Sequence, residues 1–145
     1  EISTSPLNHF VISFYPFGSR REQQRRLNHL IYEILCRAAA YNGFSRWFKQ
    51  SSDGSFTPVY FPMPNLEKNP SGQFIIAESR DENELVNSEF DYQSQTVISV
   101  NKWIGSGEAS ERTEWEFQDG SFVFSKYLVD ETYDGKVNPI LVEEE

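Results

Sequence analysis

The stretch RTEWEFQDGSFVFSKYLV, residues 112–129, consists of two runs rich in aromatic and β-branched residues, joined by Asp119-Gly120. An Asp-Gly pair supplies the two positive φ angles of a type I′ turn, so the stretch predicts a two-residue β-hairpin. Alternation along the strands then places Glu114 and Glu116 on the solvent face. The opposite, core-facing side carries two cross-strand pairs, Trp115 with Phe124 and Phe117 with Phe122.

Other β-favouring runs lie between turns that contain Gly or Pro, and they predict further antiparallel strands. These runs are residues 10–17, 44–49, 55–61, 73–78, 96–104 and 137–142. Between the third and fourth runs, Pro62, Pro64 and Pro70 predict an irregular crossing, because proline cannot donate to a strand ladder. Asp134-Gly135 predicts another hairpin turn.

Residues 19–41 predict one long helix, capped by Ser19 and stopped by Asn42-Gly43. Its apolar positions recur at helical spacing and are Leu27, Leu30, Ile31, Ile34, Leu35 and Ala38. A helix with one such stripe packs that stripe on a neighbouring layer. We therefore expect an α+β fold in a single domain of residues 1–145, with this long N-terminal helix on an antiparallel sheet of about six or seven strands.

The composition excludes several classes of function. The 145 residues include 12 Phe, 7 Tyr and 3 Trp, which indicates a folded chain, and the net charge is -9. That charge argues against binding to nucleic acid or to anionic lipid and favours a basic protein partner. One Cys excludes an internal disulfide, one Cys with two His cannot build a Cys/His zinc site, and no apolar run is long enough to span a membrane.

The residues form no strong catalytic or metal motif, and we expect no cofactor. Cys36 is typical of a small hydrophobe rather than of a nucleophile, because no imidazole is placed near it. Glu114 and Glu116, two residues apart on one strand, have a spacing compatible with an acid–base pair, but a run of acids beside a tight hairpin is normally a solvated sheet face. Residues 130–135 begin like a calcium-binding loop, yet the twelfth position is Leu141 instead of Glu.

The segment GSGEAS, residues 105–110, is small and polar and joins two strands that are rich in aromatic and β-branched residues. Glycines let such a loop protrude, and Ser106 and Glu108 offer a hydroxyl and a carboxylate to a partner. We predict that Ser106, Gly107 and Glu108 bind a partner, together with the acidic face at Glu114 and Glu116. An ordinary strand connection is the alternative.

The C-terminal half resembles the small bacterial periplasmic lysozyme inhibitors and the related immunity proteins against peptidoglycan-cutting toxins. The resemblance rests on residues 90–92, 97–99, 105–107, 115–120 and 122–124. It implies a noncatalytic protein whose Ser-Gly loop, here Ser106-Gly107, enters the cleft of a basic muramidase. It also implies a periplasmic or secreted location, with a cytoplasmic one as the alternative.

Two further hypotheses remain open. The aromatic content also fits a small α+β enzyme or ligand-binding domain that has an aromatic pocket with carboxylates at its mouth. The third hypothesis is an adaptor that presents a cationic helix face to an acidic partner, and that face comprises Arg20, Arg21, Arg25 and Arg26. The sequence does not specify an oligomeric state.

Overall fold

The computed structural model describes residues 8–14 and 27–142, and the side chains from residue 30 onward. This part of the chain is all β and contains no helix, so the expected α+β class is wrong. The first strands are β1 (Asn8–Phe14), β2 (Leu27–Ala38), β3 (Gly43–Gln50), β4 (Phe56–Pro58), β5 (Phe61–Lys68) and β6 (Phe74–Glu82). The remaining strands are β7 (Glu84–Val86), β8 (Ser88–Asp91), β9 (Thr96–Lys102), β10 (Ser110–Gln118), β11 (Ser121–Asp130) and β12 (Ile140–Leu141).

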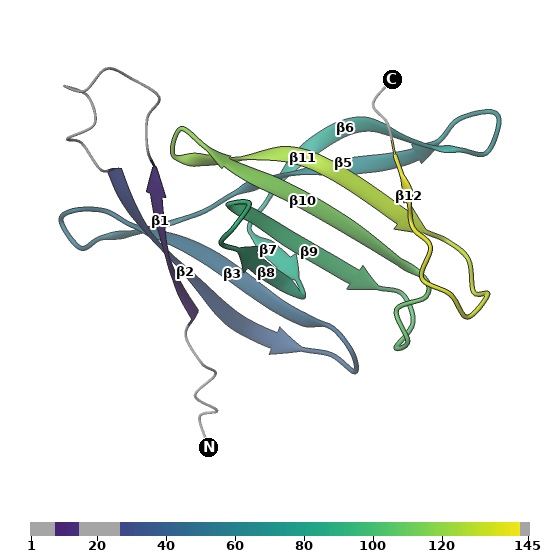
Figure 1. The fold of residues 1–145 in the computed structure, drawn as a ribbon, viewed down its shortest axis with the longest axis horizontal. Coiled ribbons are helices and arrows are strands. Elements are labelled where there is room, and N and C mark those ends of the chain that lie inside the picture. Colours follow the sequence, from purple (N-terminus) through teal and green to yellow (C-terminus); the bar gives the residue numbers. More distant parts are fainter. Residues whose placement is uncertain (1–7, 15–26, 143–145) are drawn as a thin grey trace.

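These strands form two five-stranded sheets and one separate hairpin (Figure 1). The first sheet has the order β1-β2-β3-β4, and β7 also pairs with β3. The second sheet has the order β12-β11-β10-β9-β8, and β5 pairs with β6 in the hairpin. All of these pairings are antiparallel, so the described chain is built by local hairpins and short crossings.

The chain changes sheets at Asn87, between β7 and β8. Asn87 has a φ of 42°, a left-handed conformation that asparagine tolerates better than most residues. Its side chain accepts a hydrogen bond from the Gly43 N–H and donates to Asn42 Oδ1 and to the Val100 carbonyl, each within 2.9 Å. Asn42 in turn contacts the backbone of Lys102. This network joins the β2–β3 turn to β9 and fixes the two sheets to each other.

The predicted hairpin is confirmed. Gln118 pairs with Ser121 and Phe117 with Phe122, and the turn residues Asp119 and Gly120 have φ angles of 49° and 88°. The predicted register holds as far as the Trp115 and Phe124 pair and then shifts by one residue. The shift is a β-bulge, in which Ser125 is the extra residue on β11.

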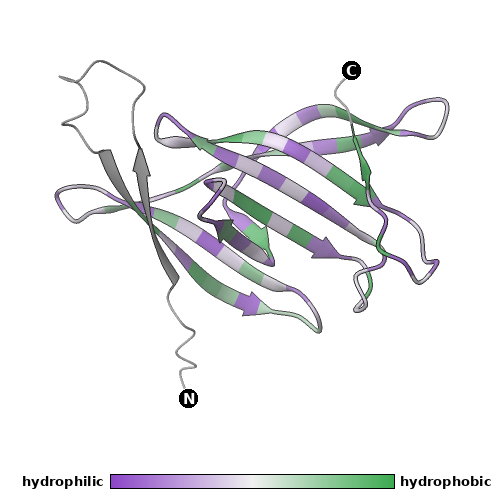
Figure 2. Cartoon of the chain, in the orientation of Figure 1, coloured by the Kyte–Doolittle hydropathy of each residue, from purple (hydrophilic) through white to green (hydrophobic). Residues whose placement is uncertain are grey.

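The core lies between the two sheets and the β5–β6 hairpin. Its largest fully buried side chains are Trp47, Trp115 and Phe61, one from the first sheet, one from the second and one from the hairpin. Phe61 packs against both Trp rings and stacks on Phe122 at 4.8 Å. The predicted aromatic cluster is therefore largely confirmed, with Phe124 packed at its edge. In Figure 2 strongly hydrophilic residues alternate with less hydrophilic or hydrophobic ones along the second half of β10, as a strand with one core-facing side requires.

The predicted helix is replaced by β2, and residues 19–26 lie outside the described part of the chain. On β2 the buried side chains are Ile31 and Glu33, two residues apart, which is the spacing of a strand. Ile34 and Leu35, which a helix stripe would bury, are 37% and 39% exposed. Pairing with β1 and β3 therefore overrides the local helical periodicity.

The irregular crossing expected at the prolines is also wrong, because β5 runs through Pro62 and Pro64. β5 pairs only with β6 in the described ladders, so the missing N–H groups on its other side interrupt no ladder. The Pro62 carbonyl instead accepts a 2.8 Å hydrogen bond from the Trp115 indole. The run expected at residues 55–61 is split between β4 and the start of β5.

Candidate functional site

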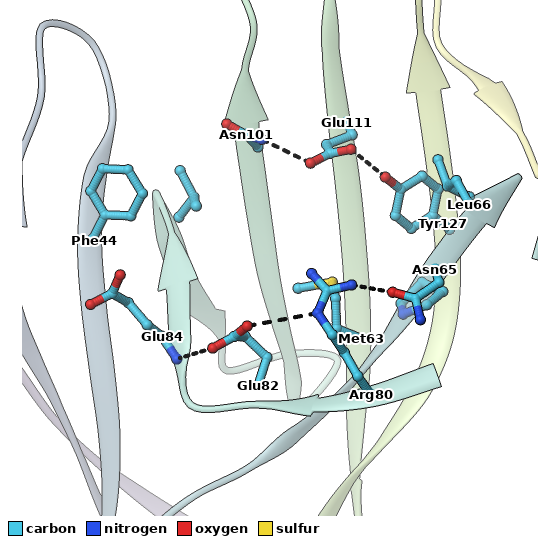
Figure 3. A pocket seen from close by; sticks show the side chains of 12 residues that line it. Phe44, Met63, Asn65, Leu66, Arg80, Glu82, Glu84, Asn101, Glu111 and Tyr127 are labelled. Carbon is cyan, nitrogen blue, oxygen red and sulfur yellow. Dashed lines mark hydrogen bonds and ion pairs between the residues drawn. The ribbon is translucent and has the colours of Figure 1, made fainter. Parts of the chain in front are cut away.

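A pocket of about 490 Å³ opens where the hydrophobic core ends, between the second sheet, the β5–β6 hairpin and the adjoining edges of β3 and β7. Its size is within the range of small-molecule sites. The lining residues are Phe44, Met63, Pro64, Asn65, Leu66, Arg80, Glu82, Glu84, Val86, Asn101, Glu111 and Tyr127 (Figure 3). The pocket therefore combines apolar walls with charged and amide groups.

A row of three polar side chains crosses the second sheet at this pocket. Asn101 on β9 pairs with Glu111 on β10 in the strand register, and its Nδ2 donates a 2.8 Å hydrogen bond to Glu111 Oε1. Tyr127 on β11 donates a 2.5 Å bond from its hydroxyl to Glu111 Oε2. Both oxygens of the Glu111 carboxylate are thus held in place by neutral donors from the two neighbouring strands.

The opposite wall of the pocket comes from the hairpin and β7. Arg80 on β6 donates to Asn65 Oδ1 on β5, and its Nε lies 3.9 Å from Glu82 Oε2. Glu84 on β7 pairs with Arg37 at 2.7 Å and lies 3.8 Å from Arg46. Figure 3 shows this wall facing the Asn101–Glu111–Tyr127 row across the pocket.

Tyr127 is only 3% exposed, and its hydroxyl is hydrogen-bonded to Glu111. Burial raises the pKa of this phenol far above its ordinary value, and the hydrogen bond to Glu111 and the charge of Glu111 raise it further. Tyr127 is therefore a permanent donor to Glu111 and carries no charge of its own at neutral pH.

The sequence-predicted loop lies at the β9–β10 connection, beyond the pocket. Ser106 is exposed, Gly107 has a φ of 77°, and the Gly107 N–H donates a 2.9 Å hydrogen bond to the Ile104 carbonyl. Glu108 is half-buried, and a Cβ added to Gly135 would lie 3.7 Å from its Oε2. The loop is therefore a compact turn beside the segment that joins β11 to β12.

Glu114 and Glu116 lie on the outer face of β10, opposite to Glu111. Glu114 forms ion pairs with Arg112 at 2.8 Å and Lys126 at 3.5 Å, whereas Glu116 accepts hydrogen bonds from Gln118 and Ser125. Glu116 is six residues beyond Ser110, where β10 begins, a span of roughly 20 Å, and Glu108 lies in the loop before Ser110. The structure therefore does not bring the five predicted partner-binding residues into one site.

The other candidates from the sequence have local roles or cannot be placed. The Cys36 thiol is exposed on β2 and donates to the Ile34 carbonyl. Asp130 binds the backbone of Thr132 and Asn138, and within the described residues no group of three His, Cys, Asp or Glu side chains could hold a metal ion. The four arginines of the adaptor hypothesis lie outside the described residues.

Membrane-spanning helices are also absent from the described part of the chain. In these ranges no helix is long and apolar enough to cross a membrane.

Sequence reasoning missed Glu111, although a signal for it was present. Alternation along β10 places Glu111 and Thr113 on the same face as Trp115 and Phe117. A carboxylate on the core-facing side of a strand requires polar partners or an opening to solvent. Glu111 has both, because Asn101 and Tyr127 bind it and the pocket opens beside it.

Comparison with known proteins gives a family but no function. Residues 16–136, which are most of the chain, match the model of a family described as protein of unknown function (DUF1176). No curated protein and no solved structure matches the chain significantly. The chain therefore belongs to the DUF1176 family of proteins of unknown function.

Proposed function

We propose that this chain is a noncatalytic binding protein whose ligand occupies the pocket beside Glu111. The observation that carries the proposal is the Asn101–Glu111–Tyr127 row, which presents a carboxylate held by two hydrogen bonds to a pocket of about 490 Å³. Polar groups fixed in advance in a pocket that also has apolar lining residues are typical of ligand recognition, because little ordering is needed when the ligand binds.

The other charged side chains of the pocket support recognition rather than chemistry. Arg80 is held by Asn65 and Glu82, and Glu84 is held by Arg37. The aromatic side chains beyond the pocket fill the interior between the sheets instead of lining an open cavity. The proposal keeps the ligand-binding part of the hypothesis from the sequence, on an all-β scaffold, without its enzymatic part and without the aromatic pocket that it expected.

A shift map by NMR tests the proposal. The ¹⁵N-labelled chain is titrated with three compounds of similar shape, n-butylguanidinium, n-butylurea and pentanoate, which are a cation, a neutral molecule and an anion. We expect at least one of them to shift the amide signals of Asn101, Glu111 and Tyr127. If all three leave these signals unchanged at millimolar concentration, the pocket is not a binding site for groups of this size.

A second candidate function is inhibition of a basic peptidoglycan hydrolase in the periplasm or outside the cell. The net charge of -9 supports it, because an acidic protein associates faster with a basic partner. The loop supports it as well, since Ser106 is exposed at a turn fixed by Gly107. Its direct test is inhibition of a muramidase such as a lysozyme by the purified chain at low and at physiological salt.

A further inference from the structure

We infer that the pocket selects a cationic end group, an ammonium or a guanidinium, that pairs with the Glu111 carboxylate. This inference rests on the proposed binding function and names the class of ligand. It depends on how the charges of the pocket are paired, on the hydrogen bonds that hold Glu111, and on the walls around it.

The three carboxylates of the pocket differ in their partners. Glu82 lies 3.9 Å from Arg80, and Glu84 lies 2.7 Å from Arg37. Among the described residues, no Lys or Arg side chain lies within ion-pair distance of Glu111. Glu111 is therefore the pocket carboxylate whose charge has no cationic partner in this part of the chain.

The neutral partners of Glu111 position it without neutralising it. Asn101 and Tyr127 each donate one hydrogen bond, and Tyr127 keeps its proton because burial and Glu111 raise its pKa. A carboxylate oxygen can accept more than one hydrogen bond, so each Glu111 oxygen retains acceptor capacity. A planar guanidinium or an ammonium can use that capacity in a charge-assisted hydrogen bond, which is stronger than a neutral one.

The apolar walls fit the alkyl stem that carries such a group in biological molecules. Met63, Leu66, Val86 and Phe44 line the pocket together with the polar row. Long cationic side chains bury their methylene groups along apolar surface while the charged end finds a polar partner. The cation could belong to a small amine or guanidine, or to a Lys or Arg side chain of a protein, and the chemistry at Glu111 is the same.

Arg80 constrains the rest of the ligand. It lies on the wall opposite Glu111 (Figure 3), and its charge also acts on Tyr127. A second cationic group near Arg80 would be repelled, so a ligand with one cationic end is favoured over a dication. We therefore use the monocation n-butylguanidinium as the probe and its neutral isostere n-butylurea as the matched control.

The experiment measures dissociation constants for both probes by NMR titration of the wild-type chain. We expect n-butylguanidinium to bind roughly tenfold more tightly than n-butylurea, since the two differ in charge and hardly in shape. This comparison uses one protein, so it does not depend on the folding of any variant. Equal or tighter binding of n-butylurea or pentanoate at the pocket overturns the cationic preference and leaves the proposed binding function standing.

Two variants test whether Glu111 causes the preference for n-butylguanidinium over n-butylurea. Glu111→Gln should abolish the preference for the cation, whereas Glu116→Gln, the same change on the outer face of the same strand, should retain it. Loss of the preference in Glu116→Gln with retention in Glu111→Gln would overturn the assignment. Absence of binding by all probes to the wild type would instead overturn the proposed function itself.

A further titration distinguishes the two sources of the cation. The peptide Gly-Gly-Arg-Gly-Gly carries the same guanidinium on a polypeptide backbone. Binding of the peptide at least as tight as that of n-butylguanidinium supports a protein side chain as the ligand. Weaker binding of the peptide supports a free small cation, because the backbone then hinders entry into the pocket.

Discussion

The hydroxyl of Tyr127 donates a 2.5 Å hydrogen bond to Glu111 Oε2, although Tyr127 pairs with Thr113 in the strand register. The bond is therefore diagonal across β10 and β11, and it ties a buried phenol to the carboxylate of the pocket. The two groups depend on each other, because Glu111 accepts the hydrogen bond of the Tyr127 hydroxyl and Tyr127 fixes the position of Glu111.

Tyr127→Phe should lower the free energy of unfolding by about 1.5 kcal/mol, which is typical for loss of a hydrogen bond to a charged group. Tyr133→Phe is the matched control, because Tyr133 is 63% exposed, and it should change stability by less than about 0.5 kcal/mol. Urea denaturation followed by tryptophan fluorescence measures both. Equal effects of the two substitutions would contradict a stabilising role for the Tyr127–Glu111 bond.

Phe122→Ala should destabilise the fold by roughly 3–5 kcal/mol, because it removes a ring that packs on Phe61 and Phe117 in the core. The neighbouring Val123, which is 41% exposed on the other face of β11, provides the control. Val123→Ala should cost less than about 1 kcal/mol. A loss below about 1 kcal/mol for Phe122→Ala would mean that this face of the hairpin is not core.

Asp130 gives the fold a dependence on acidic pH. Its pKa lies below the ordinary 3.8 because the Thr132 hydroxyl and backbone N–H groups, including that of Asn138, donate to its carboxylate. The carboxylate therefore contributes stability that is fully present above 3.8 and is lost as the pH falls through the lower folded value.

Asp130→Asn should remove this contribution, because an amide nitrogen would face the Asn138 N–H. The difference in unfolding free energy between wild type and Asp130→Asn should be constant above about pH 5 and should shrink as the pH falls below 3.8. Urea denaturation between pH 2 and pH 6 measures it. Curves that stay parallel over this whole range would rule out the carboxylate as the source.

Glu108→Lys tests the second candidate function at the loop. If the chain inhibits a basic muramidase through Ser106–Glu108, this charge reversal should slow association and weaken inhibition, most strongly at low salt. Glu131→Lys is the control, because this substitution changes the net charge by the same amount. Glu131 is exposed in the segment that joins β11 to β12. Equal effects of the two variants would show long-range attraction without contact at the loop.

The β10–β11 hairpin of the second sheet could be predicted from the sequence, because its signals are local. Asp119-Gly120 fixes the turn, and the alternation around Trp115 and Phe117 fixes the face, so the register follows up to the bulge at Ser125. The bulge itself depends on the packing of β11 in the folded protein, and no residue near it in the sequence predicts it.

The first sheet could not be predicted in the same way. The apolar spacing around Ile31 fits a helix, but β2 pairs with β1 and β3, and the face of this sheet that carries Ile31 packs into the core. That pairing joins strands that are neighbours in the sequence, but the apolar spacing within residues 27–38 carries no information about it. The short strands β7 and β8 were missed because the sheet change at Asn87 depends on contacts with Asn42 and β9.

The candidate site lies between these two cases. The alternation on β10 identifies Glu111 as an acid on the core side, whereas Arg80 and Glu82 reach the pocket only because the β5–β6 hairpin folds over the second sheet. The five residues that the sequence predicts to bind a partner stand out by loop flexibility and by acidic charge, and these properties do not show where polar groups converge.

The most direct test of the account compares two carboxylates that are three residues apart in the sequence, Glu108 in the loop and Glu111 in the pocket. Isothermal titration calorimetry gives the dissociation constant of n-butylguanidinium for the wild type, Glu108→Gln and Glu111→Gln. We predict that Glu111→Gln weakens binding roughly tenfold and that Glu108→Gln changes it less than about twofold. Weakening by Glu108→Gln with unchanged binding by Glu111→Gln would contradict the account and place recognition at the β9–β10 loop.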